Sequence, residues 1–296
     1  MDAPEASNYT AHYPVMLAES LAYLAIRPNG VYVDATTGMG NHTQAIAERL
    51  TEGFVIACDR DPESIERARA RTELLSGRIR WFHGTFSMLP EALDQNGVTA
   101  VDGLLADLGV SRYQLTTAER GFSLMEDGPL DMRMDRAQRV TAADLVNELP
   151  EKQLADLIYG LGEERRSRRI ARAIVRARPI STTGRLAEVI EQAVPRTGRL
   201  HPATQTFMAL RLEVNQELEQ LDSLLAIAPD RIESGGRLVV ITFMSIEDRK
   251  VKRAFQELAR TGRATMLTKH VVRPAASEIA RNPASRSAKL RALAIA

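Results

Sequence analysis

The chain has 296 residues, of which 44% are hydrophobic and 26% are charged, and its formal net charge is +1. This length predicts one sizeable domain with an insertion, or two domains, that fold without disulfides. No apolar run reaches the roughly 20 residues of a membrane span, and residues 1–10 lack the pattern of a signal peptide, so we expect a cytoplasmic protein. Because the net charge is so small, the charge of the whole chain gives no argument for binding to nucleic acid.

Cysteine and histidine are sparse, with one cysteine and five histidines. Cys58 lies in the apolar run at 54–59, where we predict a buried structural thiol. The histidines show no spacing typical of a metal site. The sequence therefore predicts neither redox chemistry nor a bound metal.

Short apolar runs alternate with helical patterns over the first hundred residues. Helical patterns cover 41–50 and 62–75, and Asp61 before Pro62 is typical of a helix cap. The runs predicted as strands are 31–35, 54–59, 79–83 and 101–107. Strands separated by helices favour parallel pairing, so we predict an α/β fold with a Rossmann-like sheet.

This alternation stops near residue 112 and resumes near residue 205. The interval contains several helical patterns and no convincing strand, so it is predicted to be an inserted all-helical domain. The later elements are predicted as a long helix at 203–228, a strand at 237–244, a helix at 245–259, a strand at 264–272 and a partly extended segment at 277–294. We expect residues 1–111 and 206–296 to form the catalytic domain and residues 112–205 the insertion.

The first strand runs into a glycine turn, which favours a ligand site at the carboxyl end of the sheet. The turn contains Asp34, Thr36, Gly38, Gly40, Asn41 and His42. At the end of the next strand, Asp59 stands where an acidic side chain accepts hydrogen bonds from a ribose. Two plainer interpretations stay open: the glycines serve only the turn, and Asp34 only caps it.

The ligand predicted from this turn lacks phosphates, because no lysine or arginine occurs between Asp34 and Arg49. S-adenosyl-L-methionine fits, since it carries a ribose and adenine but ends in an amino acid whose ammonium Asp34 would face. Phe86, after the third strand, would lie against adenine or belong to the core. Asp107, after the fourth, is the predicted catalytic residue next to the transferred methyl, with Gln114 near the amino-acid part.

Residues 165–178 contain seven arginines and no acidic residue. At about 100° per residue, the arginines that fall on one helix face are Arg165, Arg169, Arg172 and Arg176. Guanidinium groups suit phosphate oxygens, so this stripe is a candidate RNA contact. The alternative is a solvated face that Glu163 and Glu164 partly neutralise.

Several motifs resemble the MraW-type (RsmH) methyltransferases, and the resemblance covers nearly the whole chain. They lie at 12–19, 34–42, 59–62, 118–135, 159–175, 201–218 and 235–253. The resemblance implies S-adenosylmethionine-dependent methylation of the exocyclic N4 of a cytidine in bacterial 16S ribosomal RNA. It also implies an assembled small ribosomal subunit as partner and an RNA-recognising insertion, while leaving a homodimer open.

By the same resemblance, Gly40, Asn41 and His42 would hold the methionine part, and Asp59 the ribose. The remainder of the cofactor would meet Phe86, Asp107 and Gln114. The chain departs from the family pattern at Asn41 and at Met244, where the family has glycine and histidine. Met244 either changes how the target base is read or fills scaffold volume. The rival hypotheses are a methyltransferase acting on another nucleic acid or amine, and a non-catalytic RNA-binding assembly module.

Overall fold

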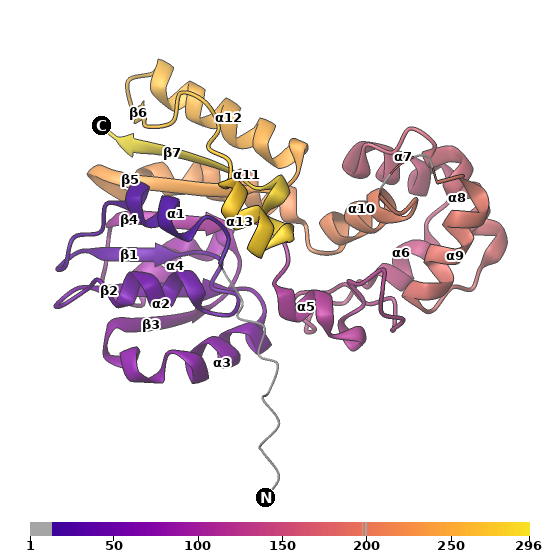
Figure 1. Ribbon diagram of the computed structural model, residues 1–296, viewed down its shortest axis with the longest axis horizontal. Coiled ribbons are helices and arrows are strands. Elements are labelled where there is room, and N and C mark those ends of the chain that lie inside the picture. Colours follow the sequence, from indigo (N-terminus) through magenta and orange to yellow (C-terminus); the bar gives the residue numbers. More distant parts are fainter. Residues whose placement is uncertain (1–13, 197, 199) are drawn as a thin grey trace, which may run out of the picture.

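The computed structural model describes residues 14–196, 198 and 200–296. His12 and the first part of the motif at 12–19 lie outside these residues, as does the N-terminal stretch that we compared with a signal peptide. The described chain has two lobes, one formed by a sheet with helices on both faces and one formed by helices (Figure 1).

One mixed sheet of seven strands organises the first lobe of the described chain, in the order β3-β2-β1-β4-β5-β7-β6. Strands β1 to β5 are parallel, and β7 pairs antiparallel with β5 and β6. The strands are β1 Val31–Asp34, β2 Phe54–Asp59, β3 Ile79–His83, β4 Val101–Asp107, β5 Ile232–Thr242, β6 Ala264–Met266 and β7 Lys289–Ile295. The predicted α/β sheet with parallel pairing of its first strands is confirmed.

Helices cover both faces of this sheet, which explains why β2 and β4 read as continuous apolar runs. Ile56 and Leu104 point to one face and pack in the core shared by α4 Leu89–Asp94, α11 Glu217–Ile227 and α12 Ser245–Arg260. Val55 and Leu105 point to the other, toward α1 Leu17–Leu24 and α2 Asn41–Ala47. The remaining helices of this lobe are α3 Pro62–Arg71 and α13 Ala276–Arg281, with short 3-10 turns η1 Glu73–Arg78, η2 Phe86–Met88, η4 Ala228–Asp230 and η5 Pro283–Ser287.

The helical lobe is inserted between β4 and β5, as predicted. It consists of α5 Arg112–Thr116, η3 Ala118–Arg120, α6 Ala142–Glu148, α7 Glu151–Gly162, α8 Ser167–Ala177, α9 Thr183–Ala193 and α10 Thr204–Val214. A separate hydrophobic core joins these helices, with Phe122 near its start and Val214 near its end in sequence. The insertion therefore has packing of its own, independent of the sheet.

The prediction of one long helix at 203–228 is wrong, because the helix breaks between α10 and α11. Gln216 at the break has a φ of 49°, in the left-handed region. The buried side chain of Asn215 accepts from the Met134 N–H at 2.8 Å and donates to the Met132 carbonyl at 2.8 Å. These bonds tie the break to a distant loop and separate a helix of the insertion from one on the sheet.

The C-terminal region also differs from the prediction. The strand expected at 264–272 ends at Met266, and the segment expected to be partly extended contains α13 and a fully paired strand, β7. Arg291 of β7 is buried and donates to Asp248 Oδ1 of α12 at 2.7 Å. An arginine at an inward-facing position interrupts the apolar pattern by which a buried strand is recognised in the sequence. Its partner, Asp248, lies far away along the chain, so the pattern around β7 gives no sign that the charge is compensated.

Candidate active site

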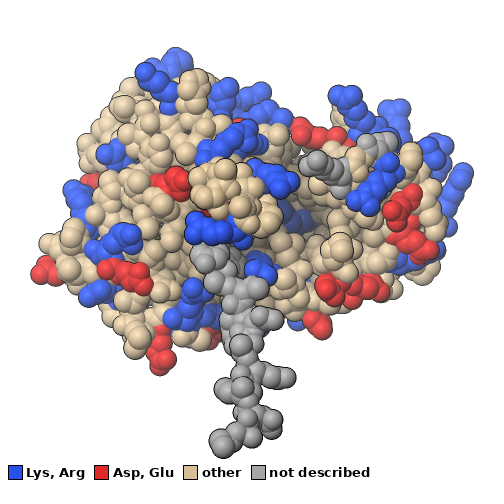
Figure 2. Space-filling model, in the orientation of Figure 1, with Lys and Arg blue, Asp and Glu red and all other residues tan. Residues whose placement is uncertain are grey.

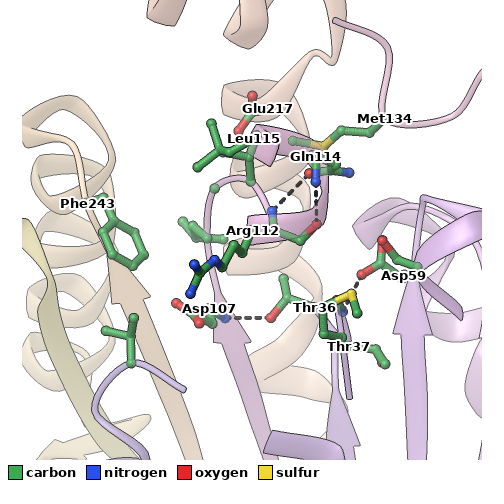
Figure 3. A pocket seen from close by; sticks show the side chains of 18 of the residues that line it. Thr36, Thr37, Asp59, Asp107, Arg112, Gln114, Leu115, Met134, Glu217 and Phe243 are labelled. Carbon is green, nitrogen blue, oxygen red and sulfur yellow. Dashed lines mark hydrogen bonds between the residues drawn. The ribbon is translucent and has the colours of Figure 1, made fainter. Parts of the chain in front are cut away.

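A cavity of about 700 Å³ lies between the two lobes, at the carboxyl ends of the parallel strands. This volume is in the range of small-molecule sites, and open α/β sheets bind ligands at this edge. Its walls come from the turns after β1 to β5, from α5, α10 and α11, and from residues 281–284 at the end of α13. Figure 3 shows Asp107 in this cavity, between Thr36 on one side and Phe243 on the other.

The turn after β1 is built around Asp34, whose side chain is fully buried. Its carboxylate accepts from the Thr36 N–H at 3.2 Å and from Thr43 Oγ1 at 2.6 Å. Burial raises the pKa of Asp34 to about 6. Asp34 is not among the residues that line the cavity. Its contacts are those of the alternative interpretation, in which it caps the turn.

Both glycines of this turn have positive φ values, 50° at Gly38 and 79° at Gly40. A Cβ on Gly40 would lie 3.0 Å from a side chain of α3, so a larger residue would push the turn away from that helix. Gly38, Asn41 and His42 line the cavity, whereas Gly40 does not. Gly40 thus shapes the turn that presents the other three.

Asp59 stands at the end of β2 and lines the cavity. Its Oδ2 accepts from the Gly38 N–H at 2.7 Å, and its Oδ1 accepts from the Asp61 N–H at 2.9 Å. Burial raises the pKa of Asp59 to about 6, so the group is mostly ionised at neutral pH. A carboxylate offers about four lone-pair sites. Two backbone donors therefore leave acceptor capacity for hydroxyl groups of a ligand.

The ring of Phe86 lines the cavity after β3 and also packs against the sheet core. Both interpretations of this residue, adenine contact and core, are consistent with its position. His83 lies outside the cavity lining, and its Nε2 is 3.1 Å from the Arg60 carbonyl oxygen. His83 thus contacts the turn after β2 and not the ligand space.

Asp107 ends β4, and its backbone N–H donates to Thr36 Oγ1 at 2.6 Å. Its Oδ2 is 3.9 Å from His42 Nδ1, while its Oδ1 is buried with no hydrogen-bond partner among the described residues. Burial, reinforced by the charges of Asp34, Glu247 and Glu278, raises the pKa of Asp107 well above its usual range. A buried acceptor without a partner costs free energy, so this oxygen marks a place where a ligand donor fits.

Gln114 lines the cavity, but both ends of its amide are occupied by protein groups. Its Oε1 accepts from the Ser111 N–H at 2.9 Å in a capping box at the start of α5, and its Nε2 donates to Asp61 Oδ2 at 2.8 Å. Asp61 also caps α3 by accepting from the Glu63 N–H, as predicted. Gln114 therefore couples the loop after β4 to the helix after β2.

Arg120 ties the block at 118–135, one of the motifs that resemble the family, to the start of α3. This side chain is 1% exposed. It donates to Asp61 Oδ2 at 2.9 Å and to Glu63 Oε2 at 3.3 Å. It also donates to the carbonyl oxygens of Arg133 and Met134, at 3.0 and 2.8 Å. Arg120 thus fastens the entry loop of the insertion to α3, and Met134 reaches the cavity wall.

A cluster of three charged side chains, Arg211, Glu217 and Glu247, lines the cavity on the side of the helical lobe. Arg211 of α10 donates to Glu217 of α11 at 2.7 Å, and its Nη2 lies 3.9 Å from Glu247 of α12. Burial raises the pKa of Glu247. Met244 packs in a small apolar cluster with Leu212 and Leu218, and it does not line the cavity. This position favours the interpretation that Met244 fills space in the scaffold over the one in which it changes how the target base is read.

Of the predicted arginine stripe, Arg169, Arg172 and Arg176 lie on α8, at the outer edge of the helical lobe, where Figure 2 shows many Lys and Arg side chains. The prediction is wrong for Arg165, which precedes this helix because α8 begins at Ser167. All four arginines are exposed. Arg172 forms an ion pair with Glu151 at 3.4 Å. Within the described chain, no ion pair or side-chain hydrogen bond involves Arg165, Arg169 or Arg176, nor the neighbouring Arg168. The stripe is therefore largely uncompensated.

Sequence reasoning missed several cavity residues. Met134, Arg211, Glu217 and Phe243 all line the cavity. A signal existed for Phe243, which directly follows the buried strand β5 at the same sheet edge as Asp59 and Asp107. The others come from loops and helices whose approach to this edge depends on long-range packing. Among the described residues, no group of three or more potential ligands could hold a metal ion.

The sheet order, the glycine turn after β1 and the acidic residue after β2 define an S-adenosylmethionine-dependent methyltransferase. The chain belongs to the MraW methylase family, whose model matches residues 9–296. Ribosomal RNA small subunit methyltransferase H of Solibacter usitatus (strain Ellin6076) is 62% identical over 282 residues, covering 95% of this chain and 99% of that protein. The protein of the same name from Acidobacterium capsulatum is 50% identical over 290 residues, covering 95% and 97%.

Proposed function

We propose that this protein transfers a methyl group from S-adenosyl-L-methionine to the exocyclic N4 amine of a cytidine in 16S ribosomal RNA. The family and the names of the relatives support a small-subunit ribosomal RNA as substrate. The observation that carries the chemistry is Asp107 Oδ1, a buried acceptor that has no partner among the described residues. It lies in a cavity large enough for a cofactor and a base.

The cavity residues suit S-adenosylmethionine, which supplies an electrophilic methyl group on a sulfonium when bound. Asp59 retains lone pairs for the ribose hydroxyls, and Phe86 offers an apolar surface to adenine. Gly38, Asn41 and His42 present the turn to the methionine part. Gln114 would hold the cavity wall in place through its hydrogen bond to Asp61. Asp34 and Gly40 would hold the turn after β1 in its conformation.

Asp107 would make the amine of cytosine reactive by accepting one of its hydrogen bonds. That amine is a poor nucleophile because its lone pair is delocalised into the ring, so it needs alignment and exclusion of water. When bound, the cofactor would supply its methyl group to N4 and leave as neutral S-adenosylhomocysteine, while Asp107 or water would accept the N4 proton. Cys58 is buried and lies outside this cavity, which argues against a cysteine adduct.

Substitution of Asp107 tests the proposed chemistry. Hypomethylated small subunits and radiolabelled S-adenosylmethionine are incubated with wild type, Asp107→Ala and Asp102→Asn, a control at the opposite end of β4. We expect label in N4-methylcytidine with wild type and the control, and a loss of at least about 100-fold with Asp107→Ala. Wild-type transfer by Asp107→Ala would refute its role. Label absent from N4-methylcytidine with the wild-type enzyme would refute the proposed function.

We propose that the insertion, expected at residues 112–205, recognises RNA through the stripe Arg165, Arg169, Arg172 and Arg176, and that the expected segments 1–111 and 206–296 form the catalytic domain. Because α10 packs in the core of the helical lobe, we place the end of the insertion at Val214 and not at residue 205. The exposure of these arginines and the scarcity of acidic partners support this role. We infer that the substrate is the assembled small subunit, because a net charge of +1 gives little non-specific affinity for bare RNA.

Charge reversal tests the stripe. The double variant Arg169→Glu and Arg172→Glu should bind subunits more weakly and show a shallower dependence of log affinity on log salt, by about 0.7 to 0.9 for each phosphate that the variant no longer neutralises. The control is Arg185→Glu on α9, whose side chain is already paired with Glu188. Equal affinity and equal salt dependence in both variants would contradict an RNA contact and favour the alternative, in which the stripe is a solvated helix face.

A further inference from the structure

We propose that Phe243 is the platform on which the target cytosine ring lies, in the part of the cavity between β4 and β5. This inference rests on the proposed function, because it names where the acceptor base of that reaction binds. It concerns an aromatic residue that lines the cavity and for which the cofactor has no evident use.

The strand order separates this position from the cofactor candidates. Along the sheet edge, the order β2-β1-β4-β5 brings Asp59, the glycine turn, Asp107 and Phe243 into succession. Neighbouring strands are about 4.8 Å apart, so Phe243 lies roughly 14 Å from Asp59 along the edge. A cofactor whose ribose meets Asp59 and whose methyl group reaches Asp107 leaves the Phe243 side of the cavity for the acceptor.

The backbone at Phe243 is held in place while its ring remains accessible. Its N–H donates to Glu247 Oε2 at 3.0 Å, and the Met244 N–H donates to the same oxygen at 2.9 Å. The ring is partly buried against the sheet core. Figure 3 shows it directed at the cavity, on the side of Asp107 away from Thr36. A partly exposed ring on a fixed backbone in this position can support a flat ligand.

Gly109 keeps the space beside this ring open. It has a φ of 113°, which other residues rarely adopt, and a Cβ built on it would lie 3.8 Å from Cδ2 of Phe243. A side chain at this position would therefore contact the ring at this carbon. The absence of a side chain at Gly109 thus leaves a gap beside the ring of Phe243.

The chemistry of this gap selects a planar base that carries an amine. The ring of Phe243 accepts the face of any base, since every base has a π surface. The free Oδ1 of Asp107 adds a demand for a hydrogen-bond donor at the edge of that base, and the exocyclic amine of cytosine meets it. Uracil carries an oxygen at that position and would leave the carboxylate unsatisfied.

The experiment compares Phe243→Leu, which keeps apolar volume, with Phe243→Tyr, which keeps the ring. The control is Phe54→Leu, at the opposite end of the sheet on β2. The measurements are kcat and KM for hypomethylated small subunits, the affinity for S-adenosylhomocysteine by calorimetry, and the melting temperature. Base stacking is lost only in Phe243→Leu, so we expect its kcat/KM to fall roughly 5- to 150-fold.

Phe243→Tyr should retain wild-type kcat/KM within a few fold, and all three variants should bind S-adenosylhomocysteine as wild type does. Unchanged kcat/KM in Phe243→Leu would overturn the proposal, as would an equal loss in Phe54→Leu. A parallel loss of S-adenosylhomocysteine affinity in Phe243→Leu would also overturn it, by assigning the ring to the cofactor. Failure of the wild-type enzyme to form N4-methylcytidine would instead refute the proposed function.

Discussion

Replacement of Arg120 by methionine tests how the insertion is fastened to the sheet. Methionine keeps the apolar stem and removes the guanidinium, which is buried together with Asp61. The change leaves Asp61 with two neutral donors, Gln114 Nε2 and the Glu63 N–H, and removes its ion pair. The carbonyl oxygens of Arg133 and Met134 lose their donor as well.

Breaking a buried ion pair by removing one partner costs about 3–5 kcal/mol, because a desolvated charge is left behind. A stability change of 1 kcal/mol shifts the melting temperature of a protein this large by about 2–4 °C. Arg120→Met should therefore melt roughly 6–20 °C below wild type. The matched control is Arg136→Met, in the same loop and 3.8 Å from the same Glu63, but 45% exposed. Its loss should stay below about 1 kcal/mol.

The assay is urea unfolding and calorimetric melting of Arg120→Met, Arg136→Met, Asp61→Asn and the double variant Arg120→Met/Asp61→Asn. If the cost arises from the uncompensated carboxylate, neutralising Asp61 should recover part of it, giving a coupling energy of more than about 1 kcal/mol. A loss in Arg120→Met no larger than that in Arg136→Met would refute the role of Arg120 as the fastening residue.

Two further predictions concern protons. The pKa of Asp34 is raised from 3.8 to about 6, so the folded state holds this proton more tightly and wild type should lose roughly 3 kcal/mol of stability as pH rises between these values. Urea unfolding of Asp34→Asn should show a smaller slope than wild type but not a flat one, because Asp59, whose pKa is also raised to about 6, still titrates. The surface control Glu257→Gln should keep the wild-type slope; identical slopes in all three proteins would contradict the assignment. Binding of cationic S-adenosylmethionine should lower the raised pKa of Asp107 and release protons in the pH range between the pKa values of the free and the bound protein. Calorimetry in buffers of different ionisation enthalpy measures this release, which Asp107→Asn should largely abolish; undiminished release would exclude Asp107 as its source.

The sequence predicts the parts of this protein that depend on local pattern. Strands β1 to β4 are readable because both sheet faces are buried, and Asp59 and Asp107 are found because chemistry gathers where such strands end. Asp61 is readable as a helix cap because capping involves neighbours in sequence. Each of these features depends on neighbours within a few residues or on the general geometry of parallel sheets.

The features that could not be predicted depend on partners far apart in the chain. The break at Asn215 depends on hydrogen bonds to Met132 and Met134, and nothing near residue 215 announces them. The turn role of Asp34 depends on a buried hydroxyl, that of Thr43, where the sequence also allowed a ligand contact. The buried charge of Arg291 conceals β7, since its compensation comes from Asp248.

The position of β7 inside the sheet has a consequence for how the protein matures during translation. Residues 289–295 are made after every other strand, yet they pair with β5 on one side and β6 on the other. Until they leave the ribosome, the edge of β5 is an unpaired strand of the kind that pairs with other chains. The core of the helical lobe ends at Val214 and can close much earlier. The lobe proposed to recognise RNA can thus form on the nascent chain before the sheet beneath the active site is complete.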